Sequence, residues 1–397
     1  MNTEQIKELA SKYIINTYGI RDLALVRGRG VNVWDAEGKE YLDFVGGIAV
    51  NLLGHCHPAV TTVIKSQAET LIHVSNLYYI EPQVKLAELL CQLSFGQKCF
   101  FCNSGAEANE AAIKLTRKYA KQQFGSDKYE IITMLGSFHG RTLATITATG
   151  QPKYHQGFEP LVPGFVYATF NNLDSVKEKI NEHTCAIMVE PIQGESGVHP
   201  AKPEFIAGLR QVCDQYNLLL IYDEVQCGLA RTGKMFAYEL YDVPPDIMTL
   251  SKGLGGGVPI GAMVTTDKIA AAFSPGNHAS TFGGNPLSTA AAYATLQTIL
   301  KERLIENATK LGEYFFAQLL KLKNKYAFIT EVRGKGLMLG IELDREGKPY
   351  VAKCTEKGLL INCVADKVLR FLPPLIIKPK HIDTAINILD QVLSEVN

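Results

Sequence analysis

The sequence predicts an α/β protein with a large, mostly parallel sheet that is covered by helices on both faces. From about residue 60 to residue 285, apolar runs of strand length alternate with helical stretches. These runs are continuously apolar, which is typical of strands that are buried on both faces. The clearest of them cover residues 99–102, 129–135, 185–189, 218–222 and 247–250.

The chain ends predict a smaller α+β part. We expect short strands over residues 24–45, a long helical stretch over 286–326, a hairpin-like segment over 331–343 and an amphipathic end over 382–396, with a short helix over 1–20. We therefore expect residues 1–60 to form the N-terminal segment of a small domain, residues 61–300 a large cofactor-binding domain, and residues 301–397 the C-terminal part of the small domain.

Composition and charge exclude several classes of protein. The chain has 397 residues, is 46% hydrophobic and 20% charged, and carries 40 basic and 40 acidic residues. This balance argues against nucleic acid or an anionic membrane as the main partner. No stretch approaches the roughly 18 consecutive apolar residues that a membrane helix needs. Nine cysteines and no visible signal peptide indicate reduced thiols in a cytoplasmic protein.

Polar or flexible residues follow each of the five apolar runs. In an open α/β sheet, the ligand crevice lies beyond the carboxyl ends of the strands. Five such ends together indicate a binding site. The segments concerned are residues 103–107, 136–141, 190–193, 223–226 and 251–257.

The first of these segments opens a predicted helix. Ser104 and Glu107 have the spacing of a capping box, and Gly105 would let a ligand approach the backbone closely. Free N–H groups at a helix start suit a phosphate group. An ordinary helix cap explains the same residues, so the segment alone does not decide between the two.

Lys252 and Asp223 end two successive buried strands. Burial at a strand end lowers the pKa of a lysine, and a lowered pKa makes its amine nucleophilic towards a carbonyl group. Asp223 could be a cap or half of a buried ion pair, or a carboxylate held against a cationic ring nitrogen. A lysine, an acid and a phosphate cradle are together what pyridoxal phosphate requires.

Six motifs, in this order along the chain, resemble the class III pyridoxal-phosphate-dependent aminotransferases. The resemblance extends from about residue 27 to residue 377 and implies the fold-type I aminotransferase fold. The motifs are residues 103–108 (NSGAEA), 137–142 (SFHGRT), 189–195 (VEPIQGE), 223–226 (DEVQ), 251–253 (SKG) and 280–286 (STFGGNP).

The resemblance implies roles for the residues that would hold pyridoxal phosphate. Lys252 would form the Schiff base and then move a proton, and Asp223 would keep the ring nitrogen protonated. Phe138 would stack on the ring, and Gln226 would donate a hydrogen bond to the ring oxygen. The remaining expected cofactor contacts are Ser104, Gly105 and Ala106 at the phosphate, and Glu224 and Val225 beside Asp223.

The resemblance also implies the substrate contacts. Arg141 would bind the substrate carboxylate with two parallel hydrogen bonds, a geometry that favours arginine over lysine. Ser280 would touch substrate, and Thr281 would bind the phosphate of a neighbouring subunit in a homodimer. Glu190 would pair with Arg370 and mask it until a second carboxylate, that of 2-oxoglutarate, enters.

The expected reaction moves the terminal amino group of N2-acetylornithine to 2-oxoglutarate. Ornithine, 4-aminobutyrate and succinyl-diaminopimelate stay open as alternative donors. Ornithine-specific relatives carry a tyrosine where this chain has Ile48, which favours an acylated donor. The missing dinucleotide fingerprint disfavours a dehydrogenase, and the presence of Lys252, Asp223 and Arg141 together disfavours a binding protein without activity.

Three other patterns have simpler explanations. Residues 228–234 match the start of a phosphate-binding P-loop, but Met235 stands where a magnesium-binding hydroxyl is needed. Cys99 and Cys102 have the spacing of a redox or zinc pair, yet they flank two core phenylalanines and lack a second pair. His55 and His57 precede Pro58 and indicate a turn before a helix. We expect no metal site.

Overall fold

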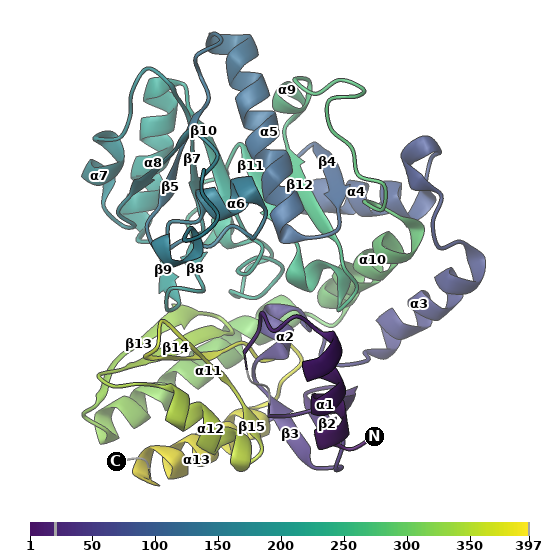
Figure 1. Ribbon diagram of the computed structural model, residues 1–397, viewed down its shortest axis with the longest axis vertical. Coiled ribbons are helices and arrows are strands. Elements are labelled where there is room, and N and C mark those ends of the chain that lie inside the picture. Colours follow the sequence, from purple (N-terminus) through teal and green to yellow (C-terminus); the bar gives the residue numbers. More distant parts are fainter. Residues whose placement is uncertain (20–21, 396–397) are drawn as a thin grey trace.

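The computed structural model describes residues 1–19 and 22–395 as two lobes that meet along a central seam (Figure 1). The larger lobe is built on a seven-stranded sheet, and the smaller lobe carries both ends of the chain. Residues 20, 21, 396 and 397 lie outside the described part, so the outermost positions of the expected first and last helices cannot be compared.

The large sheet confirms the predicted fold class. Its parallel strands include all five apolar runs, and one strand, β12, is antiparallel to both of its neighbours. In spatial order the strands are β4 (Lys98–Cys102), β12 (Gly261–Thr265), β11 (Ile247–Leu250), β10 (Leu219–Asp223), β7 (Thr184–Val189), β5 (Glu130–Met134) and β6 (Phe165–Ala168).

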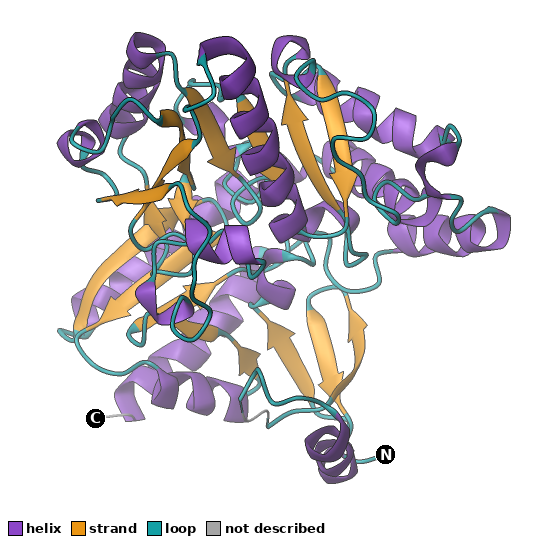
Figure 2. Cartoon of the chain, turned by 45° about the horizontal axis from the view of Figure 1, so that its top comes forward, coloured by secondary structure: helices purple, strands orange, loops and turns teal. Residues whose placement is uncertain are grey.

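The strands are continuously apolar because each face of the sheet packs on a separate helical layer (Figure 2). Leu219 and Ile221 of β10 pack in one core with α5 (Gly105–Phe124), whereas Leu220 and Tyr222 pack in another core with α8 (Pro203–Tyr216). Alternate side chains of a strand point to opposite faces, so burial on both faces requires apolar residues at every position.

The remaining elements of the large lobe surround this sheet. The helices are α3 (Pro58–Thr70), α4 (Glu81–Leu93), α6 (Leu143–Ala148), α7 (Leu173–Lys177), α9 (Asp267–Ala270) and α10 (Pro286–Lys301), with the short 3-10 helices η1 (Ser75–Leu77), η2 (Pro152–Tyr154), η3 (Ala237–Leu240) and η4 (Lys252–Gly255). A hairpin of β8 (Ile192–Gln193) and β9 (His199–Pro200) reaches towards the smaller lobe (Figure 1).

Segments far apart in the chain combine in the small lobe. Strand β15 pairs in parallel with β3, so the C-terminal third completes a sheet that the first fifty residues begin. One sheet has the order β1 (Leu25–Arg29), β2 (Asn32–Asp35), β3 (Glu40–Asp43), β15 (Leu359–Leu360), and the other has the order β13 (Ile329–Lys335), β14 (Met338–Leu343), β17 (Val368–Phe371), β16 (Asn362–Val364). The helices are α1 (Thr3–Tyr13), α2 (Gly46–Ala49), α11 (Leu304–Lys325), α12 (Lys348–Glu356) and α13 (Pro379–Glu395).

One expected element is wrong. The long helical stretch over residues 286–326 is two helices, α10 and α11. Arg303 lies between them in the left-handed region, with a φ of 56°. Neither glycine nor proline marks this break, so the sequence pattern gives no sign of it. The predicted hairpin over 331–343, in contrast, is present as β13 and β14.

No described helix combines the length and the apolar character that crossing a bilayer would require.

Candidate active site

A cavity of about 250 Å³ lies at the carboxyl ends of the parallel strands. This is the position at which open α/β sheets bind their ligands. The cavity receives side chains from the ends of β10 and β11, from the loop after β5 and from the start of α5. Its lining residues are Gly105, Ala106, Asn109, Phe138, His139, Gly140, Arg141, Glu190, Asp223, Val225, Gln226, Ser251 and Lys252.

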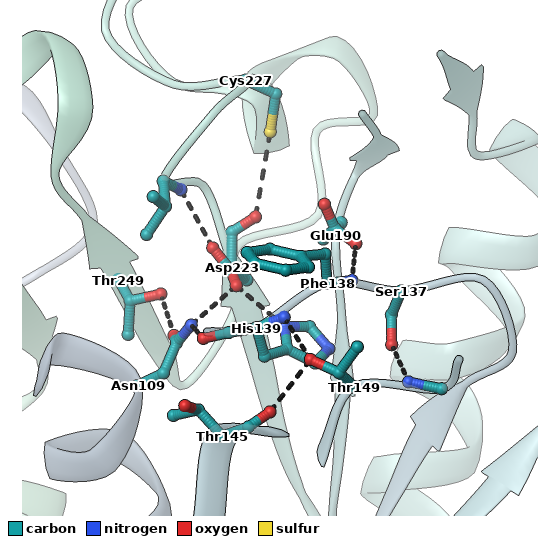
Figure 3. Close-up of polar contacts among 12 residues, drawn as sticks. Asn109, Ser137, Phe138, His139, Thr145, Thr149, Glu190, Asp223, Cys227 and Thr249 are labelled. Carbon is teal, nitrogen blue, oxygen red and sulfur yellow. Dashed lines mark hydrogen bonds and ion pairs between the residues drawn. The ribbon is translucent and has the colours of Figure 1, made fainter. Parts of the chain in front are cut away.

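Asp223 forms the centre of a buried polar network (Figure 3). Its Oδ2 accepts hydrogen bonds of 2.8 Å from Asn109 Nδ2 and lies 2.8 Å from His139 Nδ1, and its Oδ1 accepts from the Val225 N–H at 3.0 Å. Thr249 Oγ1 donates to Asn109 Oδ1 at 2.7 Å, which orients the amide so that its NH₂ group faces the carboxylate. The carboxylate is therefore held in one position.

Lys252 lies at the end of β11, as the first residue of η4, with a left-handed φ of 40°. The turn brings its side chain into the cavity wall beside Asp223. Burial lowers the pKa of Lys252, while the carboxylates of Glu195 and Asp223 act in the opposite direction. The direction agrees with the expectation from the sequence. A larger neutral fraction of this amine is available near neutral pH than for an exposed lysine.

The start of α5 forms one wall of the cavity. Ser104 is the N-cap, and its Oγ accepts from the Glu107 N–H at 3.2 Å, so Ser104 shapes the turn without lining the cavity. Gly105 and Ala106 follow, in the first turn of the helix, where backbone N–H groups lack partners within the helix. A Cβ on Gly105 would lie 2.7 Å from the side chain of Val225, so only glycine allows this approach.

Arg141 reaches the cavity from the loop after β5. Its guanidinium carbon lies 4.1 Å from the ring centroid of Tyr154 and 5.4 Å from that of Phe138. These stacking contacts fix the plane of the guanidinium and leave its N–H groups free to bind a carboxylate. Tyr154 was not singled out in the sequence.

The expected pairing of Glu190 with Arg370 is wrong. Arg370 Nη1 lies 2.7 Å from Glu195 Oε1, and Glu190 instead accepts a hydrogen bond from the Phe138 N–H at 2.9 Å. The reason is geometric: Glu190 ends β7 inside the cavity, whereas Glu195 lies in the turn between β8 and β9, which reaches the small lobe and Arg370 on β17. Burial and the Asp223 carboxylate raise the pKa of Glu190.

Gln226 belongs to the Arg370 cluster, which we define as Arg370, Glu195 and Gln226. Gln226 Nε2 donates to Glu195 Oε1 at 3.0 Å, and its Oε1 accepts from Arg370 Nη1 at 3.1 Å. The backbone oxygen of Gly194 accepts a further bond from Arg370 at 3.1 Å. Gln226 lines the cavity while Arg370 is buried behind it, so this residue joins the cluster to the cavity.

Glu224 is not a cavity residue, which corrects the expectation from the sequence. Its carboxylate turns away from Asp223 and accepts hydrogen bonds from the backbone N–H groups of Ala237 (2.6 Å) and Tyr238 (2.8 Å) at the start of η3. Burial raises the pKa of Glu224 to about 8. The residue holds the segment after β10 in place and has no contact with the cavity.

Ser280 and Thr281 lie outside the cavity of this chain. Ser280 Oγ accepts hydrogen bonds from Asn103 Nδ2 at 3.2 Å and from the Gly283 N–H at 3.0 Å, and Thr281 is exposed. Asn76 Nδ2 donates to the backbone oxygens of Ser280 and Gly283 and holds this loop.

The sequence reasoning missed four residues of the cavity wall as site residues: Asn109, His139, Gly140 and Ser251. His139 lies within the second of the six motifs and Asn109 directly follows the first, and the signal that could have found them is the buried carboxylate of Asp223. A buried carboxylate needs several donors, and these are polar side chains near the ends of neighbouring strands.

The residues of the cavity fit pyridoxal phosphate. The start of α5 offers backbone donors for a phosphate, Phe138 offers an aromatic face, and Asp223 offers a fixed carboxylate.

Nε2 of His139, which is buried, has no hydrogen-bond partner among the described residues. Within the described part of the chain, no group of side chains could hold a metal ion.

Comparison with known proteins agrees with this arrangement. A family model described as aminotransferase class-III matches residues 16–393. The acetylornithine aminotransferase of Caldanaerobacter subterraneus subsp. tengcongensis is 55% identical over 97% of this chain and 98% of its own length. That of Methanocaldococcus jannaschii is 54% identical over the full length of both chains. The succinylornithine transaminase of Photorhabdus laumondii is 47% identical over 96% of each chain.

Solved structures share the fold. The ornithine aminotransferase of Toxoplasma gondii, described as having partial occupancy of PLP at its active site, superposes with a TM-score of 0.95 at 32% identity. The match covers 99% of this chain and 94% of that chain.

Proposed function

Because the chain belongs to the class III aminotransferase family, we propose that it moves the terminal amino group of N2-acetylornithine to 2-oxoglutarate. The products are N-acetylglutamate semialdehyde and glutamate, which is a step of arginine biosynthesis. The observation that carries the proposal is the half-buried Lys252 amine in one cavity with the fixed Asp223 carboxylate.

Pyridoxal phosphate is the cofactor of this reaction. When bound, it supplies an aldehyde that condenses with amines and a ring that takes up an electron pair. The N–H groups of Gly105 and Ala106 would hold its phosphate, and Phe138 would cover one ring face. Asp223 would face the ring nitrogen and keep its proton in place.

Lys252 supports the reaction as nucleophile and as proton carrier. Burial lowers its pKa, so its amine can accept a proton near neutral pH and return it to a neighbouring carbon. Asn109, His139 and the Val225 N–H supply the Asp223 carboxylate with the hydrogen bonds that water would otherwise give and hold it in place.

The Arg370 cluster would let one cavity accept two kinds of substrate. Arg370 Nη1 lies 2.7 Å from Glu195 Oε1, so the charge of Arg370 is neutralised by Glu195. An amino donor with an uncharged group beside Arg370 could then bind without facing an unpaired positive charge. When the second carboxylate of 2-oxoglutarate enters, it would replace Glu195 as the partner of Arg370. Glu195 is suited to this exchange because its side chain is 24% exposed, whereas that of Arg370 is 1% exposed. Arg141 would bind the other carboxylate.

The donor follows from two observations. The two relatives reported above with the higher identities to this chain are acetylornithine aminotransferases. Ile48 lies in α2, which contacts the η4 segment that carries Lys252, and an apolar side chain there suits an acylated amine better than free ornithine. N2-succinylornithine is the second candidate, because a succinylornithine transaminase is 47% identical to this chain.

We also propose that the enzyme is a homodimer in the cytoplasm. Thr281 would then reach the phosphate site of the second subunit. Four large apolar side chains near this loop are exposed and would be covered by that subunit, namely Leu77 (80%), Tyr78 (70%), Tyr79 (102%) and Phe282 (60%). Light scattering of the purified protein measures the assembly, and a monomer that turns over at the full rate would contradict this part of the proposal.

A donor panel tests the proposed function. The purified enzyme with pyridoxal phosphate is assayed with N2-acetylornithine, N2-succinylornithine, ornithine, 4-aminobutyrate and succinyl-diaminopimelate, with 2-oxoglutarate as the acceptor. We expect the highest kcat/KM for N2-acetylornithine. The holoenzyme should be yellow, and borohydride should attach the cofactor to Lys252. A colourless protein that stays inactive with every donor would contradict the proposal.

A further inference from the structure

Two cysteine side chains touch on the face of β4 that packs on α4. Cys91 lies in the last turn of α4 and Cys99 is the second residue of β4, and their sulfur atoms are 3.8 Å apart. This is a hydrogen-bonding distance for two thiols. A four-residue connection, residues 94–97, joins the two elements, which also pack on each other.

The partner of Cys99 differs from the one that the sequence spacing indicates. Cys102 lies three positions along the same strand and therefore points to the opposite face of the sheet. Its sulfur donates to the backbone oxygen of Ser104 at 3.5 Å. The C-x-x-C spacing is thus incidental, and the close pair of sulfurs is that of Cys91 and Cys99.

The pair lies near the surface of the protein. Cys91 and Cys99 are each partly exposed, so a small molecule can approach the pair. Most other cysteines of the chain, among them Cys102, Cys185 and Cys213, are buried.

The surroundings of the two sulfurs make them chemically unequal. The hydrogen bond from Cys99 and the positive charge of Lys98 lower the pKa of Cys91 to about 7. The same hydrogen bond, together with burial, raises the pKa of Cys99. Cys91 is therefore the thiol of the pair that ionises first, and the thiolate is the nucleophile in thiol–disulfide exchange. Cys99 holds the proton.

We propose that Cys91 and Cys99 form a reversible dithiol–disulfide pair that reacts with low-molecular-weight disulfides such as oxidised glutathione. The Cys91 thiolate attacks one sulfur of the external disulfide and releases one thiolate. The Cys99 thiol then loses its proton and attacks the Cys91 sulfur, which releases the second thiol. Two protein thiols are oxidised and one external disulfide is reduced to two thiols, so that atoms and electrons balance. Closure requires the sulfurs to approach from 3.8 Å to about 2.05 Å.

The test treats the reduced, full-length protein with oxidised glutathione and uses mass spectrometry as the readout. A Cys56→Ser background removes the one cysteine of the exposed class. We expect the protein to lose two hydrogens, and trypsin to release the peptides of residues 86–98 and 99–114 joined by a disulfide. Dithiothreitol should restore the original mass. This readout does not depend on the proposed function, since it needs neither cofactor nor substrate.

Three variants locate the bond. Cys99→Ser should stop at the first step and keep one glutathionyl group on Cys91. Cys91→Ala should leave Cys99 unmodified. Cys102→Ser, which changes the other cysteine of the second peptide, should behave like the parent protein. Circular dichroism verifies that each variant folds. A disulfide that persists in Cys99→Ser, or a parent protein that keeps its thiols or retains glutathione without closing the bond, would overturn the proposal.

Discussion

The two sides of the cavity hold their charges in different ways. On one side, Asp223 receives its hydrogen bonds from Asn109, His139 and the Val225 N–H, which all belong to the large lobe. On the other side, Arg370 comes from the small lobe and is held by a charged partner, Glu195, from the large lobe. Three donors converge on the Asp223 carboxylate, whereas Arg370 is paired with one carboxylate, that of Glu195, which we propose a substrate carboxylate replaces.

This difference follows from where the residues lie in the fold. Asp223 ends a strand in the middle of the sheet, and its donors lie on α5, in the loop after β5 and in the segment that follows β10 itself. Glu195 lies in a hairpin turn at the seam between the lobes (Figure 1). A carboxylate in a turn can move without disturbing the sheet, and one at the end of a central strand cannot.

In the proposed reaction Lys252 acts in both half-reactions, with the donor and with 2-oxoglutarate, so its loss should have the largest effect. We expect Lys252→Ala to reduce kcat by about 10⁴-fold with either substrate, because a positioned proton carrier contributes up to about that factor. Stopped-flow measurement of the two half-reactions separates the donor from 2-oxoglutarate. A variant that keeps a tenth of the parent rate in either half-reaction would contradict this role.

Asp223 tests the fixed side. Asp223→Asn removes the charge and keeps the size, and we expect both half-reactions to slow by a similar factor of about 10²–10³. Glu224→Gln is the matched control, since Glu224 is the next residue and has no contact with the cavity. Loss of one half-reaction alone in Asp223→Asn would show that the two sides do not differ as we describe.

Arg370 tests the exchangeable side. We expect Arg370→Ala to raise the KM for 2-oxoglutarate by about 10–100-fold, as expected for the loss of a charge-assisted hydrogen bond. The donor half-reaction should change much less. Glu195→Gln should instead affect the donor half-reaction. Without the Glu195 carboxylate, Arg370 keeps an unpaired charge, so the enzyme should discriminate less well between amino donors. An Arg370→Ala variant with unchanged affinity for 2-oxoglutarate would remove the basis for the exchange.

Glu224 should produce the smallest effect, on stability. Burial raises the pKa of Glu224 from 4.5 to about 8 in the folded protein, so the unfolded chain ionises first. Between these two values a rising pH therefore favours unfolding. Glutamine does not ionise, so Glu224→Gln lacks this loss of stability. From pH 5 to pH 8 the free energy of unfolding of the parent should therefore fall relative to that of the variant. Urea titrations across this range measure the slope, and a flat difference would contradict the raised pKa.

The sequence was sufficient where one residue type has one physical use. Continuous apolar runs predicted the central strands, and the residues after them predicted that Lys252 and Asp223 meet in one crevice, where the structure places both. The sequence was insufficient where the pairing of two residues depends on which side chains the fold brings together in space. Glu190 and Glu195 lie in one motif and have the same side chain, so only the direction of the hairpin decides which of them meets Arg370. The contact between Cys91 and Cys99 likewise depends on how α4 packs on β4.

The parallel pairing of β15 with β3 sets an order of events during protein synthesis. Strands β1, β2 and β3 leave the ribosome early, but the edge of β3 that Leu359 and Leu360 occupy stays open until most of the chain has been translated. Chains grow by about 5–20 residues per second, so this edge waits for tens of seconds. Nascent chains stalled before residue 359 should therefore be recognised by chaperones at this edge, and those stalled well beyond it should not.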